Sequence, residues 1–375
     1  MIVTCFSLTD FRNYETFTLE PHPALTVLVG PNAIGKTNVI EALQLVTSGA
    51  SFRRPAWSEI VRWGAEEARV CMRAQDGTRS LDVAAVVAAD GTRTFAVDGR
   101  TQRRAADVVG LLPSVTFTPE DLGLMKGPAE RRRAAADDLG EQLSATYGSL
   151  RRDYGRVVRQ RNTLLREGAP TAELGVWDEQ LASLGARLVT HRLRLLARVM
   201  DHASKLYSAM AGGETLSWSY EDRCGLEWAG SPGIDVEETK DRIAAEIVRR
   251  SDEERRRAVS LVGPHRDDVV FTIGERPARA FASQGQQRTA ALAWKLAEVS
   301  VIEELMHRRP VLLLDDVMSE LDGARRTALS EAVADRTQTF VTTTNLGYFD
   351  EQTLAGASVV QLGSADGPTS GRARR

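Results

Sequence analysis

The chain has 375 residues, 42% of them hydrophobic, and a formal net charge of −3, which allows two or three folded domains and excludes general disorder. Its three cysteines (Cys5, Cys71 and Cys224) are scattered without metal-ligand spacing, which predicts inert thiols in a reducing compartment. No secretory signal is evident, and the apolar runs fall far short of the roughly 20 residues that span a bilayer. We therefore expect a cytoplasmic protein with no membrane partner.

The first 120 residues have the pattern of strands around one helix. Residues 2–20 alternate apolar and polar side chains, and LTVLVG at 25–30 is the short apolar run of a buried strand. A helix is expected from Lys36. The dipeptides Asp90-Gly91 and Asp98-Gly99 predict the turns of a hairpin. PSVTFTPEDL at 113–122 predicts another strand, which ends at Pro119.

From about residue 121 to 255 the pattern becomes helical. Two stretches have heptad-like spacing, the first broken only by Arg161, and the polar segment EGAPTAELG lies between them. This predicts an antiparallel helical hairpin, either a protruding coiled coil or the ordinary core of a helical domain. The heptad positions are Tyr147, Leu150, Tyr154, Val157 and Leu164, then Trp177, Leu181, Leu184, Leu188 and Leu195.

The same region has an uneven charge distribution. Residues 150–198 contain ten arginines and five acidic residues, although the whole chain is slightly acidic. A basic stripe can neutralise the phosphates of a nucleic acid. A solvated arginine-rich helical face is the alternative.

Strand patterns return near the C-terminus. DDVVFTIG, PVLLLDD and TQTFVTTTN predict strands, and residues 283–306 and GARRTALSEAVA predict helices. The tail is rich in Gly, Ser and Arg and is expected to be disordered. We therefore expect an α/β lobe I formed by residues 1–120 and 259–363, an inserted helical lobe II at 121–258, and a tail at 364–375.

Residues 30–37 have the pattern of a phosphate-binding loop, which follows an apolar strand and opens a helix. The glycines let the backbone amides turn toward phosphates, Lys36 would neutralise the β and γ phosphates, and the Thr37 hydroxyl would hold Mg²⁺. The sequence therefore predicts an ATP site lined by Gly30, Pro31, Asn32, Ala33, Ile34, Gly35, Lys36 and Thr37.

The acidic side of this site is expected at the end of the apolar strand at 311–314. Asp315 and Asp316 would lie at its C-terminal edge, where ligands of parallel sheets bind. Asp315 would orient Mg²⁺, and Asp316 would polarise the attacking water. Together with Lys36 these are the predicted catalytic residues. An ordinary turn is the alternative for this pair taken alone.

A third motif, SQGQQR at 283–288, lies at the start of a helix. It resembles the signature of ABC ATPases, in which a serine, a glycine and a helix N-terminus contact the γ-phosphate held by another subunit. Ser283, Gly285 and Gln286 are therefore expected to bind the nucleotide of a partner copy. Ser283 could instead be a simple helix cap.

Together with four further motifs, these motifs resemble the RecF family of SMC-like ABC ATPases. The further motifs are FRNY at 11–14, PEDLGLMKGPAERRRAAAD at 119–137, GPHRDD at 263–268 and LLDDVMSELDGARRTAL at 313–329. The resemblance extends over both ends of the chain and the lobe junction. It implies an α/β ABC-type ATPase head with a short coiled-coil-like hairpin. It also implies that Arg12 reaches the nucleotide, although a surface ion pair remains open for this residue. Arg131 to Arg133 could contact DNA or brace the lobe junction.

The sequence departs from the ABC pattern at three places. Asp316 stands where most ABC proteins carry glutamate, and its shorter side chain predicts slow hydrolysis. TTTN at 342–345 occupies the position of the usual switch histidine, where Thr344 or Asn345 would be the sensor. No clear glutamine lies between the lobes near Pro119. His265, Arg266 and Asp267 are expected to form a turn rather than a catalytic cluster.

As the resemblance implies, the expected function is ATP-dependent DNA binding in recombinational repair. ATP and Mg²⁺ would drive a homodimer that binds single-stranded, gapped or double-stranded DNA as a weak ATPase switch. With RecR-like mediator proteins it would help to load a RecA-type recombinase, supporting replication and the SOS response. The alternatives are another soluble SMC-like ABC ATPase and a repair scaffold with a vestigial nucleotide site. A kinase is less favoured because the serine-glycine signature would then have no role.

Overall fold

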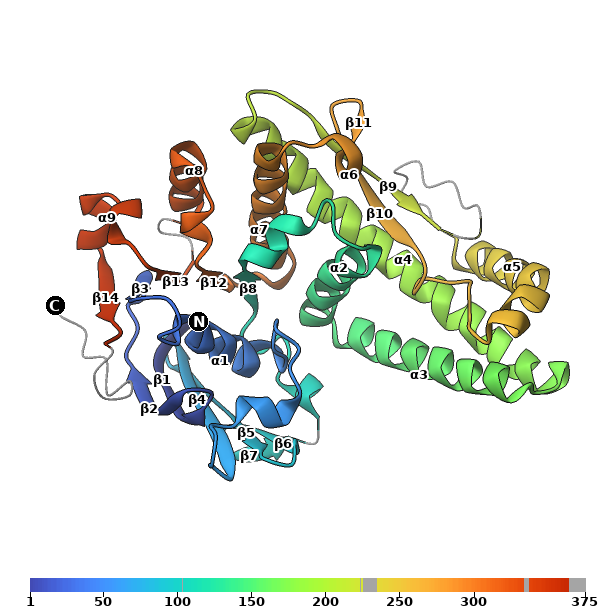
Figure 1. Cartoon of the computed structure of the whole chain (residues 1–375), viewed down its shortest axis with the longest axis horizontal. Coiled ribbons are helices and arrows are strands. Elements are labelled where there is room, and N and C mark those ends of the chain that lie inside the picture. The colour runs from blue at the N-terminus through green and yellow to red at the C-terminus, as the bar shows by residue number, and fades with distance from the viewer. Residues whose placement is uncertain (103, 223, 225–234, 334–336, 364–375) are drawn as a thin grey trace. The chain divides into compact units, whose positions relative to one another are not determined.

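The computed structural model describes the chain except residues 103, 223, 225–234, 334–336 and 364–375 (Figure 1). The tail predicted to be disordered lies outside the described residues. The contacts within the chain define two compact units. The first unit is Met1–Leu122 with Glu298–Arg375, and the second unit is Gly123–Ala297.

The first unit contains an antiparallel sheet of six strands. The predicted alternation over residues 2–20 is confirmed, because buried and more exposed side chains alternate along its first two strands. The hairpin turns at Asp98-Gly99 and Asp90-Gly91 are also confirmed. In spatial order the strands are β2 (Tyr14–Leu19), β1 (Ile2–Phe11), β4 (Glu67–Asp76), β5 (Arg79–Ala88), β6 (Arg93–Val97) and β7 (Arg100–Gln102).

A parallel sheet of five strands forms the other part of the first unit. The two predicted apolar strands and the strand predicted at 337–345 lie here, and their central position explains their nearly continuous burial. The sequence predicted one mixed sheet in lobe I, whereas the structure has its antiparallel and parallel strands in two separate sheets. The spatial order is β14 (Ala357–Gln361), β3 (Leu25–Val29), β13 (Thr339–Thr343), β12 (Val311–Asp315) and β8 (Ser114–Phe117).

One hydrophobic core joins both sheets to helix α1 (Lys36–Ser48). Val39, Ile40 and Leu43 of this helix are buried in that core with side chains from both sheets. The amide of Gln338 also links the sheets, because Val3 N donates to its Oε1 at 2.6 Å and its Nε2 donates to Val3 O at 2.8 Å. The shorter elements are η1 (Trp57–Ile60), η2 (Ala105–Asp107), η3 (Pro119–Gly123), η4 (Val317–Ser319), α8 (Gly323–Val333), η5 (Leu346–Tyr348) and α9 (Glu351–Ala355).

The second unit is mainly helical, and the predicted hairpin is confirmed. Helices α3 (Ala145–Glu167) and α4 (Thr171–Met210) lie side by side, joined by a short turn in which Gly168 adopts φ 68° (Figure 1). The other helices are α2 (Ala129–Leu143), α5 (Val236–Arg257), α6 (Ala278–Phe281) and α7 (Gln284–Met306), the last of which continues into the first unit.

A small antiparallel sheet belongs to the second unit as well. Its order is β11 (Arg276–Pro277), β10 (Asp268–Ile273) and β9 (Leu216–Glu221). Because β10 pairs with β9, residues 259–297 belong to the second unit, whereas the sequence placed 259–363 in lobe I. The strand β9 lies in a region that was expected to be helical. It could not be predicted from local sequence, because it is stabilised by pairing with β10, which comes later in the chain.

Arg161, which interrupts the heptad pattern of α3, is buried in the second unit with 2% of its side chain exposed. Its guanidinium donates to Asp178 at 2.6 Å, to Glu254 at 2.6 Å and to Ser260 Oγ at 2.9 Å. Carboxylates from α4 and α5 therefore neutralise its charge within the core, as a buried cation requires. No helix among the described residues is long and apolar enough to cross a membrane.

Candidate functional site

The predicted phosphate-binding loop connects β3 to α1 in the first unit. Gly35 has φ 108°, and a Cβ at this position would lie 2.7 Å from Asn13 and 2.9 Å from Tyr14. A Cβ on Gly30 would lie 2.9 Å from the backbone oxygen of Leu362. Neighbouring atoms therefore leave no room for a Cβ at either position, so glycine is required at both. The left-handed backbone conformation of Gly35 is a second reason for glycine there. This explains why the motif has glycine at these two positions.

Lys36 bends back over this loop. Its Nζ donates to Gly30 O at 2.8 Å and to Pro31 O at 2.9 Å, and the side chain is buried. Burial lowers the pKa of Lys36, and the nearby carboxylates of Asp316 and Asp315 oppose that shift. The structure therefore keeps a cation directly above the loop backbone.

Asp315 ends strand β12 and contacts helix α1 and strand β13. Its Oδ1 accepts hydrogen bonds from Thr37 Oγ1 on α1 and from Thr342 Oγ1 on β13, each at 2.8 Å. Burial raises the pKa of Asp315, and the two hydroxyl donors oppose that rise. The carboxyl ends of β3, β13 and β12 thus meet at the helix start, the usual ligand crevice of an open parallel sheet.

Asp316 adopts an unusual conformation beside this carboxylate. Its φ is 51°, a left-handed value that is uncommon for a residue other than glycine, and its backbone N donates to Thr342 Oγ1 at 2.8 Å. In the described part of the chain, its Oδ1 is buried without a hydrogen-bond partner. Burial raises the pKa of Asp316, and Lys36 opposes that rise. A strained, unsatisfied carboxylate of this kind is typical of a functional site.

These oxygen donors suit a magnesium ion. A hydroxyl and a carboxylate, Thr37 and Asp315, lie within hydrogen-bond distance, and the unsatisfied oxygen of Asp316 follows in the chain. Mg²⁺ prefers oxygen ligands and commonly uses one or two carboxylates together with substrate phosphates. Thr342 was not predicted at this site. Its sequence signal is a polar residue at the end of an apolar parallel strand.

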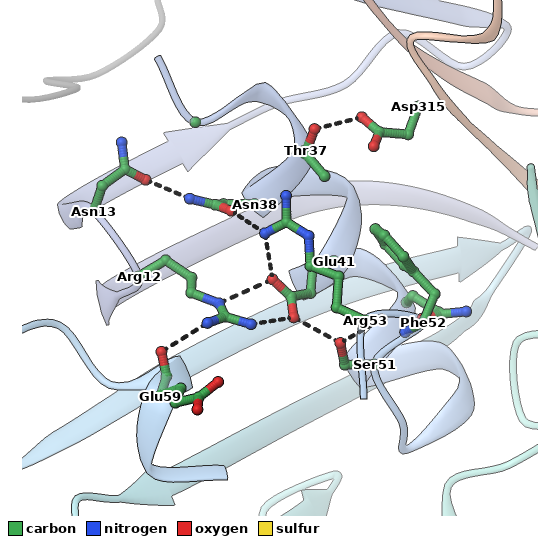
Figure 2. Close-up of polar contacts among 12 residues, drawn as sticks. Arg12, Asn13, Thr37, Asn38, Glu41, Ser51, Phe52, Arg53, Glu59 and Asp315 are labelled. Carbon is green, nitrogen blue, oxygen red and sulfur yellow. Dashed lines mark hydrogen bonds and ion pairs between the residues drawn. The ribbon is translucent and has the colours of Figure 1, made fainter. Parts of the chain in front are cut away.

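Figure 2 shows a second polar cluster on α1, centred on Glu41, which is fully buried. Arg12 donates to both Glu41 oxygens, at 3.0 and 2.7 Å, and to Glu59 O at 2.8 Å. Ser51 Oγ donates to Glu41 at 2.6 Å, and Arg53 lies 3.3 Å from the same carboxylate. Arg12 is therefore held by Glu41, and its contact with a nucleotide stays a prediction. A single acidic residue on the apolar side of α1 was the sequence signal for Glu41.

The FRNY motif also holds the loop itself. Asn13 Nδ2 donates to Ile34 O at 3.0 Å, and Tyr14 OH donates to Gly35 O at 3.1 Å. Asn38 Nδ2 in turn donates to Asn13 Oδ1 at 2.7 Å (Figure 2). Sequence reasoning singled out Arg12 of this motif and missed the loop-supporting roles of Asn13 and Tyr14.

Ser283 and Gln286 lie at the start of α7, in the second unit. Gln286 N donates to Ser283 Oγ at 3.2 Å, and Ser283 N donates to Gln286 Oε1 at 2.9 Å, which forms a reciprocal capping box. Gln286 Nε2 also donates to Glu214 at 2.7 Å. Ser283 is exposed, and Gly285 is half-buried. The helix cap is thus present, and binding of these residues to a nucleotide stays a prediction.

The arginines of the 119–137 motif brace the second unit. Arg132 is buried and donates to both oxygens of Asp268 at 2.8 Å, and Arg133 donates to Asp267 O at 2.5 Å. The expected turn at GPHRDD is confirmed, because Arg266 N donates to Gly263 O at 2.8 Å. Both arginines therefore stabilise the second unit itself, and contact with DNA or bracing of the lobe junction stays a prediction.

Comparisons with known proteins agree with this geometry. The profile of the RecF/RecN/SMC N-terminal domain family matches residues 2–363. The DNA replication and repair protein RecF of Synechococcus sp. (strain JA-3-3Ab) is 39% identical and covers 96% of each chain. The protein of the same name from Symbiobacterium thermophilum is 41% identical over 92% of each chain.

Solved structures give the same result. The recombination mediator protein RecF with ATP, in the RecFOR pathway, has a TM-score of 0.86 at 28% identity and covers 96% of this chain and 95% of that chain. An Smc head bound to the C-terminal winged-helix domain of ScpA has a TM-score of 0.56 at 15% identity, over 96% and 94% of the two chains, and shares the fold. The predicted α/β ABC-type head is confirmed. Because these matches in sequence and fold extend over nearly the whole chain, the chain belongs to the RecF family of SMC-like ABC ATPases.

Proposed function

We propose that this protein binds DNA in an ATP-dependent manner during recombinational repair, as a dimer at single-strand gaps beside duplex DNA. The observation that carries the proposal is the 2.8 Å contact between Thr37 of the phosphate loop and Asp315 of β12. This contact places a hydroxyl and a carboxylate where a loop-bound nucleotide would present its phosphates. The names of the RecF relatives support a role in DNA replication and repair.

The loop residues 30–37 would hold the phosphates of ATP, with Lys36 exchanging its two loop carbonyls for phosphate oxygens. Thr37 and Asp315 would hold Mg²⁺, which would neutralise charge on the β and γ phosphates. Asp316 would accept a proton from the attacking water, and its raised pKa suits that role. Its side chain is shorter than that of glutamate, which supports slow hydrolysis used as a switch.

Dimerisation would complete the site. Ser283 is exposed at the start of the long helix α7, where the helix dipole favours an anion. In the proposed dimer, Ser283, Gly285 and Gln286 of one copy approach the γ-phosphate held by its partner. The closed dimer would retain DNA and, with RecR-like mediator proteins, help to load a RecA-type recombinase and support the SOS response.

The proposal is tested by gel-shift binding to gapped DNA, with and without ATP. Wild type should bind more tightly with ATP, and Lys36→Met should lose this dependence because the loop then lacks its cation. Equal ATP-dependent affinity of the two proteins would reject the coupling between nucleotide and DNA.

Ser283→Arg is expected to leave ATP binding intact and to prevent ATP-dependent dimerisation. The larger side chain would clash with the nucleotide bound by the partner copy. The phosphate-binding loop of the variant's own copy would be unchanged, so ATP binding should be retained. Light scattering with and without ATP measures the dimer, and nucleotide titration provides the control. A dimer of unaltered stability would count against the shared site.

A further inference from the structure

Helix α3 carries four exposed arginines on one face. Arg152, Arg156, Arg159 and Arg166, called the arginine row below, are separated by four, three and seven residues. At 3.6 residues per turn these positions fall within an arc of about 80°, and at 1.5 Å per residue the row is about 21 Å long. The core residue Tyr154 is buried on the other side of the helix. The row therefore faces solvent along most of α3.

The chain itself neutralises little of this charge. Arg152 donates to Ser149 Oγ at 3.1 Å, and Arg166 donates to Asn162 O at 3.2 Å and Thr163 Oγ1 at 3.1 Å, all neutral acceptors. Arg156 pairs with Asp153 at 3.3 Å, and Arg152 is attracted at longer range to Glu141. Within the described chain, Arg152, Arg159 and Arg166 form no ion pair.

Other exposed arginines differ in this respect. Four of them contact a carboxylate at 2.6 to 3.1 Å, and their side chains are at least half exposed. These four arginines provide an ion-paired set with which the arginine row can be compared. The four ion pairs are Arg69–Glu67, Arg73–Asp82, Arg249–Glu246 and Arg257–Glu253.

The neighbouring helix α4 also carries exposed arginines. Arg187, His191 and Arg194 are exposed on α4 at a spacing of four and three residues, and the His191 ring lies 6.3 Å from that of Tyr147 on α3. Partial desolvation lowers the pKa of His191, and the charges of Arg194 and Arg187 lower it further, so this ring adds no charge at neutral pH. The positive field that attracts a polyanion to the exposed face of α3 therefore comes from the arginine row itself.

We propose that the arginine row binds the sugar-phosphate backbone of duplex DNA. This assignment rests on the proposed function and names the surface that contacts the duplex. Phosphates repeat about every 3.4 Å of helix axis along one strand, so a rigid row of about 21 Å can follow several of them. Single-stranded DNA is bound chiefly by stacking on aromatic side chains, whereas both tyrosines of α3, Tyr147 and Tyr154, are buried. The row therefore fits a duplex better than a single strand.

The experiment measures the salt dependence of duplex affinity by fluorescence anisotropy, using the full chain with ATP. The test variant carries Arg152→Gln, Arg156→Gln, Arg159→Gln and Arg166→Gln. Each lost phosphate contact reduces the slope of log affinity against log salt by about 0.9, so the slope should fall by about 3 to 4. Affinity at low salt should fall by about tenfold or more.

The matched control replaces Arg69, Arg73, Arg249 and Arg257 with glutamine, which removes the same formal charge from ion-paired sites. Its salt slope should stay within about one unit of wild type. Circular dichroism verifies that both variants are folded. A wild-type slope in the test variant, or equal losses in both variants, would overturn the assignment while leaving the proposed function intact. If wild-type protein bound no duplex DNA in any nucleotide state, that result would instead contradict both the proposed function and this inference.

Discussion

Arg192→Met is expected to lower the free energy of unfolding by about 3–5 kcal/mol, because it removes the buried cation that is hydrogen-bonded to the carboxylate of Asp137 and leaves that carboxylate with Arg151, at 3.5 Å. Arg192 and Asp137 have 2% and 9% of their side chains exposed, and two hydrogen bonds of 2.9 Å join them. The guanidinium also donates to Tyr220 OH at 2.9 Å and Pro264 O at 2.8 Å. Urea denaturation of both proteins at neutral pH measures the difference.

The loss of unfolding free energy in Arg192→Met should depend on pH. Burial works to raise the pKa of Asp137, but Arg192 overcomes it and holds that pKa below its usual value. In wild type, this pair therefore stabilises the fold at every pH above the pKa that an aspartate has in the unfolded chain. The stabilisation is lost as the pH falls through the lower pKa that Asp137 has in the folded protein. Without Arg192 the folded pKa of Asp137 should rise, because among the described residues only Arg151 and the hydroxyl of Tyr147 then oppose the effect of burial. The variant should then be closest to wild type at acidic pH.

Two controls make this prediction specific. Arg242→Met removes an exposed i,i+4 partner of Glu238 and should cost only about 0.5 kcal/mol. The double variant Asp137→Leu with Arg192→Met should recover part of the stability, because neither charge remains buried. If Arg192→Met costs no more than Arg242→Met, the buried pair does not have the role assigned to it.

Lys36→Met is expected to weaken ATP binding by about two orders of magnitude. Lys36 is the cation above the loop, and two charge-assisted hydrogen bonds to phosphate oxygens contribute about 3 kcal/mol together. Methionine has a similar length and no charge, so the loop backbone should be preserved. Calorimetric titration with ATP and Mg²⁺ measures the dissociation constants.

Lys205→Met is the matched control. Lys205 has 71% of its side chain exposed and pairs with Asp201, so its replacement removes the same charge far from the loop in sequence. Its ATP affinity should equal that of wild type. Similar affinity of Lys36→Met and wild type would mean that the buried ammonium does not contact the phosphates.

Much of the fold could be predicted because its signals are local. The apolar run of β3, the helix from Lys36 and the hairpin of α3 and α4 each follow from residues close together in the chain. The strand β9 was missed because LSWSYE is short and becomes a strand through pairing with β10. Strands β4 and β14 and helix α5 were not individually predicted.

The candidate site likewise has some features that the sequence could predict and others that it could not. The loop at 30–37 and the pair Asp315 and Asp316 could be recognised because each is a continuous motif after an apolar strand. Their contact could not be measured from sequence, since Thr37 and Asp315 are 278 residues apart. Glu41 was missed because it lies in no recognisable motif, and Thr342 was missed because the sensor role was assigned to Thr344 or Asn345 of the same TTTN segment. The roles of both depend on side chains from other segments.

The sequence by itself determined the nucleotide-site motifs, the family and the main helices and strands, because these depend on local backbone geometry and hydrophobic period. Only the tertiary structure decided where the charged side chains lie. Arg161, Arg192 and Glu41 are buried because ion partners from distant segments surround them, whereas the arginine row of α3 remains exposed. A charged residue can be buried only if its partners are brought to it, and that depends on the packing of the whole unit.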